Sequence, residues 1–232
     1  MTEPLPSIAA FVPMRHSSER VRGKNYRPLG GRPLFHHILA ALAECELVAE
    51  TIVDTDSELI MEDVRESFPD VGLIERPEEL RGGHVPMTDV LTHDVSVVEA
   101  DLYLQTHSTN PLLRPATITA ALRRLLESRD AHDSLFSVTP LQTRLWSPAG
   151  KPLNHDPSIL IRTQDLEPVM EENSCLYVFD KATLLETGRR FGTRPLLFPI
   201  ERDEAWDIDE ESDWRIAEAL FAAAAADQGP DR

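Results

Sequence analysis

Residues 8–45, IAAFVPMRHSSERVRGKNYRPLGGRPLFHHILAALAEC, place a short apolar run, a basic loop and a helical pattern one after another. The run IAAFV has the length and composition of a buried strand, and apolar residues recur at helical spacing over residues 33–44. A strand, a loop and a helix in this order form the first half of a βαβ unit. The stretch therefore predicts an α/β fold, in which ligands bind beyond the carboxyl ends of the strands.

The alternation of strands and helices continues along the chain. Further strands are expected at residues 51–55, 71–75, 101–105 and 134–140, with helices at 57–67, 87–99 and 115–128. Ser57 is expected to cap a helix, and Pro33 and Pro115 are expected in first turns. Strands joined by such helices need right-handed crossovers, so the pattern predicts a three-layer α/β/α fold with a mainly parallel sheet.

The alternation of expected strands and helices ends after residue 140. Residues 141–170 contain several prolines and have no clear period, which indicates a functional loop or a protruding arm. Strands are then expected at 174–180 and 195–200, with helices near 181–188 and 210–226. We expect residues 1–232 to form a single domain that carries this arm.

The composition narrows the classes of function. The chain has 40 Asp and Glu against 23 Lys and Arg, a net charge of −17, which argues against nucleic acid or an anionic membrane as a partner. Apolar runs are too short to span a membrane, and the N-terminus lacks a signal-peptide pattern. Cys45 and Cys175 fit neither a disulfide framework nor a zinc site, so a cytoplasmic location is expected.

Positive charge gathers in the loop after the first strand. Glu19 is the only acid among residues 15–32, which include Arg15, Arg20, Arg22, Lys24, Arg27 and Arg32. In an acidic chain this cluster indicates a small anionic ligand such as a phosphate, and the alternative is a solvated, charge-rich loop. The loop contains neither the P-loop motif nor the dinucleotide fingerprint GxGxxG.

Two carboxylates, Asp207 and Asp209, stand one residue apart before the last expected helix. In an extended segment, side chains at i and i+2 point to the same side. Such a pair suits a magnesium ion, with manganese as the alternative, so both are candidate metal ligands. The competing interpretation is that Asp209 and the glutamates after it cap the helix and complement its dipole.

Seven stretches of the chain together resemble the acylneuraminate cytidylyltransferase family, the CMP-sialic acid synthetases and their relatives. They are VPMRHSSERVRGKNYRPLGGRPL (12–34), TIVDTD (51–56), RPEEL (76–80), PMTDVL (86–91), LQTHSTNPLLRP (104–115), RTQDLEPVMEENSCLYVFD (162–180) and WDIDEE (206–211). The chain departs from the family pattern at several positions, among them Glu19, Asp54, His107 and Ser174. The resemblance implies a nucleotide-diphospho-sugar transferase-like, Rossmann-like fold with a dimerisation arm near residues 141–170.

The resemblance also implies roles for residues that match the family motifs. For the nucleotide it implies Arg15, Ser18, Arg20, Lys24, Asn25, Thr88, His107 and Thr109, with Arg15, Lys24 and Asp209 acting in catalysis. For the acceptor it implies Gln105, Arg162, Gln164, Asn173 and Tyr177, and it supports Asp207 and Asp209 as the metal pair.

The activity that the resemblance implies is transfer of CMP from CTP to an acidic, sialic-acid-like sugar, with release of pyrophosphate, by a cytoplasmic homodimer. Its partners would be CTP and an anionic small molecule. The alternatives are another nucleotide or another anionic acceptor, such as a phosphonate or a different sugar. A hydrolase that uses the same pocket and a degenerate nucleotide-binding domain with a regulatory role are further alternatives.

Overall fold

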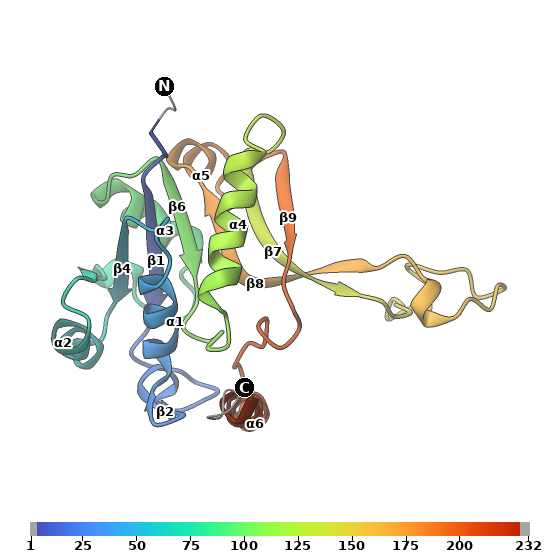
Figure 1. Cartoon of the computed structure of the whole chain (residues 1–232), viewed down its shortest axis with the longest axis horizontal. Coiled ribbons are helices and arrows are strands. Elements are labelled where there is room, and N and C mark those ends of the chain that lie inside the picture. Colours follow the sequence, from blue (N-terminus) through green and yellow to red (C-terminus); the bar gives the residue numbers. More distant parts are fainter. Residues whose placement is uncertain (1–3, 228–232) are drawn as a thin grey trace.

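One seven-stranded sheet organises residues 4–227, the part of the chain that the computed structural model describes (Figure 1). The strand order is β5-β4-β1-β6-β8-β7-β9. The strands are β1 (Ile8–Met14), β4 (Glu50–Thr55), β5 (Gly72–Glu75), β6 (Leu102–Thr106), β7 (Ser134–Leu141), β8 (Val169–Phe179) and β9 (Pro195–Pro199). β8 is antiparallel to β6 and β7, and the other ladders of the sheet are parallel. The predicted mainly parallel sheet is therefore confirmed. The expected domain also includes residues 1–3 and 228–232, which lie outside the described residues.

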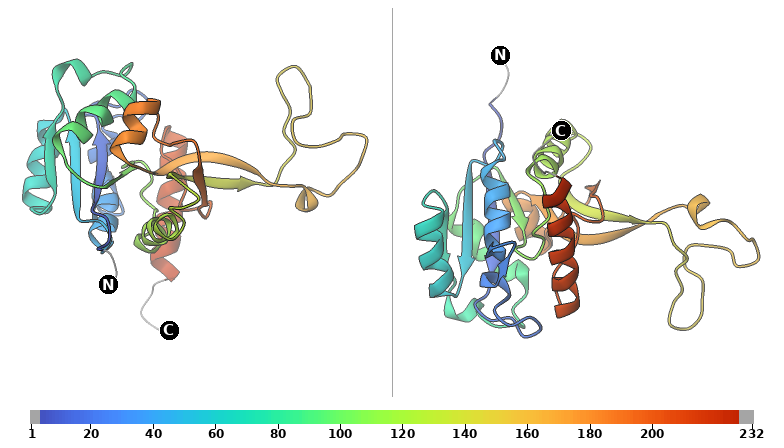
Figure 2. Two further views of the ribbon diagram at one scale, coloured as in Figure 1. Left: turned by 90° about the horizontal axis from the view of Figure 1, so that it is seen from above. Right: turned by 60° about the horizontal axis from the view of Figure 1, so that its bottom comes forward.

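Helices cover both faces of the sheet, as the three-layer prediction requires (Figure 2). The helices are α1 (Leu34–Ala43), α2 (Glu58–Ser67) and α4 (Pro115–Glu127) on one face, and α3 (Met87–Val97) and α5 (Lys181–Thr187) on the other. In β1, Ile8, Ala10 and Val12 pack with the first group, whereas Ala9 and Phe11 pack with the second. Successive side chains of a strand point to opposite faces, so a strand that is apolar throughout must be covered on both.

The predicted helix starts at Ser57 and Pro115 are confirmed, and the one at Pro33 is displaced by one residue. Ser57 caps α2, since its hydroxyl accepts the Ile60 N–H at 3.4 Å, and Pro115 is the first residue of α4. Pro33 precedes α1 instead of joining its first turn, because it pairs with Pro28 in a small antiparallel ladder. That ladder joins β2 (Pro28–Leu29) to β3 (Arg32–Pro33) inside the segment expected to be a loop.

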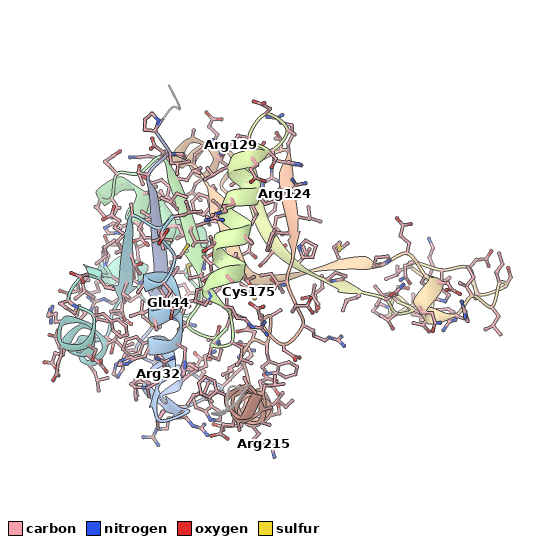
Figure 3. All side chains as sticks on the ribbon, in the orientation of Figure 1. Arg32, Glu44, Arg124, Arg129, Cys175 and Arg215 are labelled. Carbon is pink, nitrogen blue, oxygen red and sulfur yellow. The ribbon has the colours of Figure 1, made fainter. Side chains whose placement is uncertain are left out.

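β7 and β8 continue beyond the body as an antiparallel arm that carries residues 142–168 at its far end (Figure 1). The sequence predicts a strand from residue 174, but β8 begins at Val169, because Leu141 of β7 pairs with it there. Its outer residues are exposed or half-buried, and burial is complete from Cys175 onward. Figure 3 shows this division, with Cys175 in the body and the side chains of the arm standing clear of it.

α6 (Glu211–Asp227) packs on the loop after β1 and not on the sheet. Its buried Trp214 belongs to a separate apolar cluster with Val21 and Ile208. Arg27 lies over the Trp214 ring at 4.1 Å and forms an ion pair with Glu211 at 2.8 Å, so this member of the basic cluster joins the loop to the helix. The packing brings the segment before α6 beside the basic loop.

Two further expectations from composition concern residues 4–227. No helix in this range is long and apolar enough to cross a bilayer. Cys45 and Cys175 are both buried and both free, in agreement with the expectation that they form no disulfide.

Candidate active site

A cavity of about 890 Å³ opens at the carboxyl ends of β1 and β6, where an α/β sheet is expected to bind ligands. The loop after β1 contributes Arg15, Ser18, Glu19, Arg20, Lys24 and Asn25, and the loop after β6 contributes His107, Ser108 and Thr109. Arg76, Ser174, Arg190, Asp207 and Asp209 complete much of the polar wall. The cavity therefore suits a charged, polar ligand.

Lys24 and Arg20 meet Asp209 at one end of the cavity. Lys24 Nζ donates to the Ile208 carbonyl at 2.7 Å and lies 3.5 Å from Asp209 Oδ1, and Arg20 pairs with the same oxygen at 2.8 Å. The Lys24 side chain is only 13% exposed, so the protein orients its ammonium group. The basic loop and the acidic pair, far apart in sequence, form one charged cluster.

Asn25 holds the basic loop against the loop after β6. Its Nδ2 donates to the Arg15 carbonyl at 2.8 Å, and its Oδ1 accepts the Ser108 hydroxyl at 2.7 Å. Gly23, just before it, has φ +66°, a left-handed conformation that favours glycine. These contacts tie the basic loop, at the Arg15 backbone and at Asn25 next to Lys24, to the loop after β6.

Asp207 and Asp209, the predicted metal ligands, both line the cavity. Asp207 is exposed to the cavity, but protein atoms around its carboxylate partly desolvate it and raise its pKa. The charge of Asp209 adds to the shift, whereas a Thr109 hydrogen bond and Lys24 oppose it. Two repelling carboxylates beside cationic side chains suit an ion that takes one or two protein carboxylates together with phosphate oxygens.

The competing role of Asp209, capping of α6, is filled by another residue. Asp213 Oδ2 accepts the backbone N–H groups of Asp209 at 3.0 Å and of Glu210 at 2.8 Å. Glu210 is the N-cap position, because its carbonyl accepts the first intrahelical N–H groups, those of Asp213 and Trp214. Among the described residues the Asp209 carboxylate has no hydrogen bond to an N–H of α6, and it contacts Arg20 and Lys24 instead.

A buried acid pair holds Arg76 in the cavity wall. Arg76 Nε donates to Asp54 Oδ1 at 2.5 Å, and both side chains are almost fully buried. Burial and the charge of Asp54 raise the pKa of Asp94, so Asp94 is protonated and donates to Asp54. His93 lies close enough to the two acids for the three side chains to have the spacing of metal ligands. Arg76, however, already neutralises the negative charge of Asp54. We therefore assign this cluster a structural role.

His107, Gln105 and Arg190 form a polar chain along another part of the cavity. Gln105 Nε2 donates to His107 Nε2 at 2.9 Å, and Gln105 Oε1 accepts from Arg190 at 2.9 Å. Burial, helped by the positive charges of Arg190 and Lys24, lowers the pKa of His107 to about 4. A neutral His107 can accept the Gln105 hydrogen bond and remains uncharged at neutral pH.

A comparison with known families shows which family the chain belongs to. A model of the cytidylyltransferase family matches residues 9–213, from β1 to the first turn of α6. The chain belongs to the cytidylyltransferase family. Every residue that lines the cavity falls inside the matched range.

Curated relatives within the cytidylyltransferases carry different acceptors in their names. The 3-deoxy-manno-octulosonate cytidylyltransferase of Geotalea daltonii is 31% identical over 140 residues, 60% of this chain and 51% of the relative. The N-acylneuraminate cytidylyltransferase of Oncorhynchus mykiss is 27% identical over 218 residues, 91% of this chain and 49% of the relative. The CMP-N,N'-diacetyllegionaminic acid synthase of Legionella pneumophila is 27% identical over 229 residues, 92% and 96%. The chain thus spans about half the length of the first two and nearly all of the third.

Solved structures of nucleotidyltransferases share the fold. A CMP:2-keto-3-deoxy-manno-octonic acid synthetase complexed with CTP superposes with a TM-score of 0.70 at 16% identity, covering 94% of this chain and 99% of that one. A 4-diphosphocytidyl-2C-methyl-D-erythritol synthase gives 0.64 at 17% identity, covering 94% and 100%. The predicted Rossmann-like fold of this cytidylyltransferase is confirmed.

Most of the residues predicted to bind the nucleotide lie together in the cytidylyltransferase cavity. Its wall includes Arg15, Ser18, Arg20, Lys24, Asn25, His107 and Thr109, together with the predicted metal pair Asp207 and Asp209. Thr88 is the exception. It is not part of the wall, although Met87 and Val90, which are close to it in α3, are. The roles of all these residues stay predictions.

The residues predicted to bind the acceptor lie outside this wall. Gln105 and Tyr177 are fully buried behind it, and Asn173 donates to Thr139 Oγ1 at 3.0 Å within the β7–β8 ladder. Arg162 and Gln164 lie on the arm, where Arg162 pairs with Asp165 at 2.7 Å. The buried residues can affect an acceptor only through their neighbours, and those on the arm only by reaching another molecule.

Two arginines in the wall, Arg76 and Arg190, were not predicted as site residues. A signal existed for Arg76, which opens the family-like stretch RPEEL directly after a predicted strand. Arg190 lies in no such motif, and the sequence does not distinguish it from the exposed Arg189 beside it.

Three departures from the family pattern have structural explanations or places. Glu19 lines the cavity near Gly83, which Arg15 also approaches, and among the described residues it forms no ion pair within 4.0 Å. Asp54 is the partner of Arg76. Ser174 has φ +60°, the left-handed region that explains a glycine at this position in the family pattern.

Proposed function

We propose that the chain transfers CMP from CTP to an acidic sugar and releases pyrophosphate. The observation that carries this proposal is the contact of Lys24 and Arg20 with Asp209, in a cavity wall that also contains Asp207. Both the cations and the carboxylates that a triphosphate and its metal require converge there. The relatives named for 3-deoxy-manno-octulosonate, N-acylneuraminate and diacetyllegionaminic acid favour an acidic sugar as acceptor.

In the proposed reaction an acceptor hydroxyl oxygen attacks the α-phosphorus of CTP, and the bond to the β-phosphate oxygen breaks. Such transfers depend on positioning and charge neutralisation. Lys24 and Arg20 exchange their contact with Asp209 for phosphate oxygens, and Arg15 approaches the same phosphates from the end of β1. A magnesium ion held by Asp207 and Asp209 would neutralise further phosphate charge.

A pyrophosphate-release screen tests the proposal. The purified chain is given each of the four nucleoside triphosphates with 3-deoxy-manno-octulosonate, N-acetylneuraminate or a hydroxyalkyl phosphonate, with and without Mg²⁺. We expect release with CTP, an acidic sugar and Mg²⁺, with the CMP-sugar identified by mass spectrometry. Release without any acceptor would favour a hydrolase, and nucleotide binding without pyrophosphate release in any combination would favour a degenerate nucleotide-binding domain.

Replacing Lys24 with alanine is expected to lower kcat/KM for CTP by about 100-fold, the size of a lost preorganised charge contact. The reason is that Lys24 is held by the Ile208 carbonyl beside Asp209. Steady-state kinetics with CTP as the varied substrate measure the effect. Arg22→Ala is the matched control, because Arg22 is an exposed cation of the same loop outside the cavity wall. A Lys24 effect below threefold would remove it from the site.

We also propose that the arm joins two copies of the chain in a symmetric dimer. Its outer part exposes several apolar side chains, including Trp146, Ile159 and Leu160, which is 96% exposed. Exposed apolar patches of this kind mark interfaces. Leu160→Asp is expected to shift the molecular mass measured by light scattering from dimer to monomer, whereas Leu185→Asp on α5 leaves it unchanged. A wild-type monomer across a concentration series would contradict the dimer.

A further inference from the structure

Arg190 is held in one orientation against the cavity. It lies between α5 and β9, and its side chain is only 21% exposed. Its guanidinium lies 3.6 Å from the centroid of the Tyr177 ring, and its NH1 donates to Gln105 Oε1 at 2.9 Å. Stacking on an aromatic ring and a hydrogen bond to a buried amide together leave the guanidinium little freedom.

The charge of Arg190 is incompletely paired. The one carboxylate within 4.0 Å of it among the described residues is that of Glu172, and this carboxylate also accepts the Tyr177 hydroxyl. Burial lowers the pKa of Arg190, which reflects the cost of removing its charge from water. A partly desolvated guanidinium with unused N–H groups is well suited to an incoming anion.

Arg190 is separate from the cations assigned to the phosphates. Lys24 and Arg20 both lie beside Asp209. Arg190 instead joins the chain through Gln105 to His107, whose pKa both Arg190 and Lys24 lower. The charges of both Lys24 and Arg190 therefore reach His107. Of these two, Lys24 is assigned to the triphosphate, and Arg190 is available for another ligand.

We infer that Arg190 binds the anionic group of the acceptor, a carboxylate or a phosphonate, and so selects for an acidic acceptor. This inference rests on the proposed CMP transfer. The planar guanidinium matches two oxygens of one anionic group through parallel N–H donors. Gln105, which is fully buried and cannot touch the acceptor itself, is a positioning residue for Arg190.

Arg190→Met and Arg190→Lys test the inference, with kinetics measured separately for CTP and for the acidic sugar that the wild type uses best. We expect Arg190→Met to raise the KM for the acceptor by roughly 10- to 100-fold, as expected for losing hydrogen bonds to a charged group, and to change the KM for CTP less than threefold. Arg190→Lys keeps the charge but not the fork, so an intermediate value is expected. Arg189→Met, a neighbouring exposed arginine outside the cavity, is the control.

A second arm replaces the acceptor carboxylate with a carboxamide. The wild type should lose most of its kcat/KM on this analogue, and Arg190→Met should discriminate little between the two acceptors. Equal discrimination by wild type and variant, or a parallel rise of both KM values, would overturn the role of Arg190 alone. A wild type without CMP transfer to any acceptor would instead overturn the proposed function. If Arg190→Met does not fold, the Arg190→Lys values and the carboxamide result still decide between these outcomes.

Discussion

Replacing Asp209 with asparagine is expected to lower kcat for CMP transfer by roughly 100- to 1,000-fold, which is the size of losing one electrostatic contact in the transition state. Asparagine has nearly the same shape but lacks the charge that an ion requires. The fold should persist, because Asp213, and not the Asp209 carboxylate, hydrogen-bonds the backbone before α6, and the nearby apolar cluster contains Trp214. Pyrophosphate release and thermal unfolding are measured on the same sample.

The control and a second readout separate loss of metal from loss of charge. Glu210→Gln removes one negative charge from the next residue, whose exposed side chain does not line the cavity, and should retain activity. Mn²⁺ binding, followed by electron paramagnetic resonance in the presence of CTP, should weaken in Asp209→Asn and not in Glu210→Gln. Wild-type-like pyrophosphate release from Asp209→Asn would exclude Asp209 as an essential metal ligand.

The part of this site that the sequence predicted lies close to single strands or motifs. The basic loop directly follows a clearly apolar strand in the sequence. Its position at the carboxyl end of that strand could therefore be predicted without knowledge of the sheet topology. Asp207 and Asp209 could be proposed as a pair because an extended segment places alternate side chains together. Lys24 is brought to Asp209 by the apolar contacts of Trp214, which the pattern of α6 does not specify.

The features that the sequence did not predict depend on contacts between segments that are far apart in the chain. The roles of Gln105 and Arg190 depend on a hydrogen bond across 85 positions and on the ring of Tyr177 beneath the guanidinium. The early start of β8 depends on pairing with β7, which gives hydrogen bonds to residues that have no apolar alternation. Neither kind of contact leaves a periodic signal in the sequence.

Asp54→Ala is expected to lower the free energy of unfolding by about 3–5 kcal/mol, the cost of leaving a buried charge without its partner. Arg76 is 2% exposed and Asp54 is fully buried, so water cannot replace the lost carboxylate. Chemical denaturation at pH 7 measures the change. Asp94→Asn is the matched control in the same cluster. At pH 7 it should not lower the free energy of unfolding, because an asparagine donates to Asp54 as a protonated Asp94 does but requires no proton uptake on folding.

The pH dependence of these two proteins distinguishes a shared proton from a simple ion pair. Burial and Asp54 raise the pKa of Asp94 in the folded state above its unfolded value of 3.8, so the folded chain binds more protons from about pH 4 upward. The stability that this proton contributes is complete below pH 4 and is lost as the pH rises towards the raised pKa. Asp94→Asn has no such proton. Its unfolding free energy should therefore gain on that of the wild type, by at most about 1.4 kcal/mol per pH unit, between pH 5 and pH 8. Parallel stability profiles for wild type and Asp94→Asn would mean that Asp94 is ionised beside Asp54, and that Arg76 compensates both carboxylates.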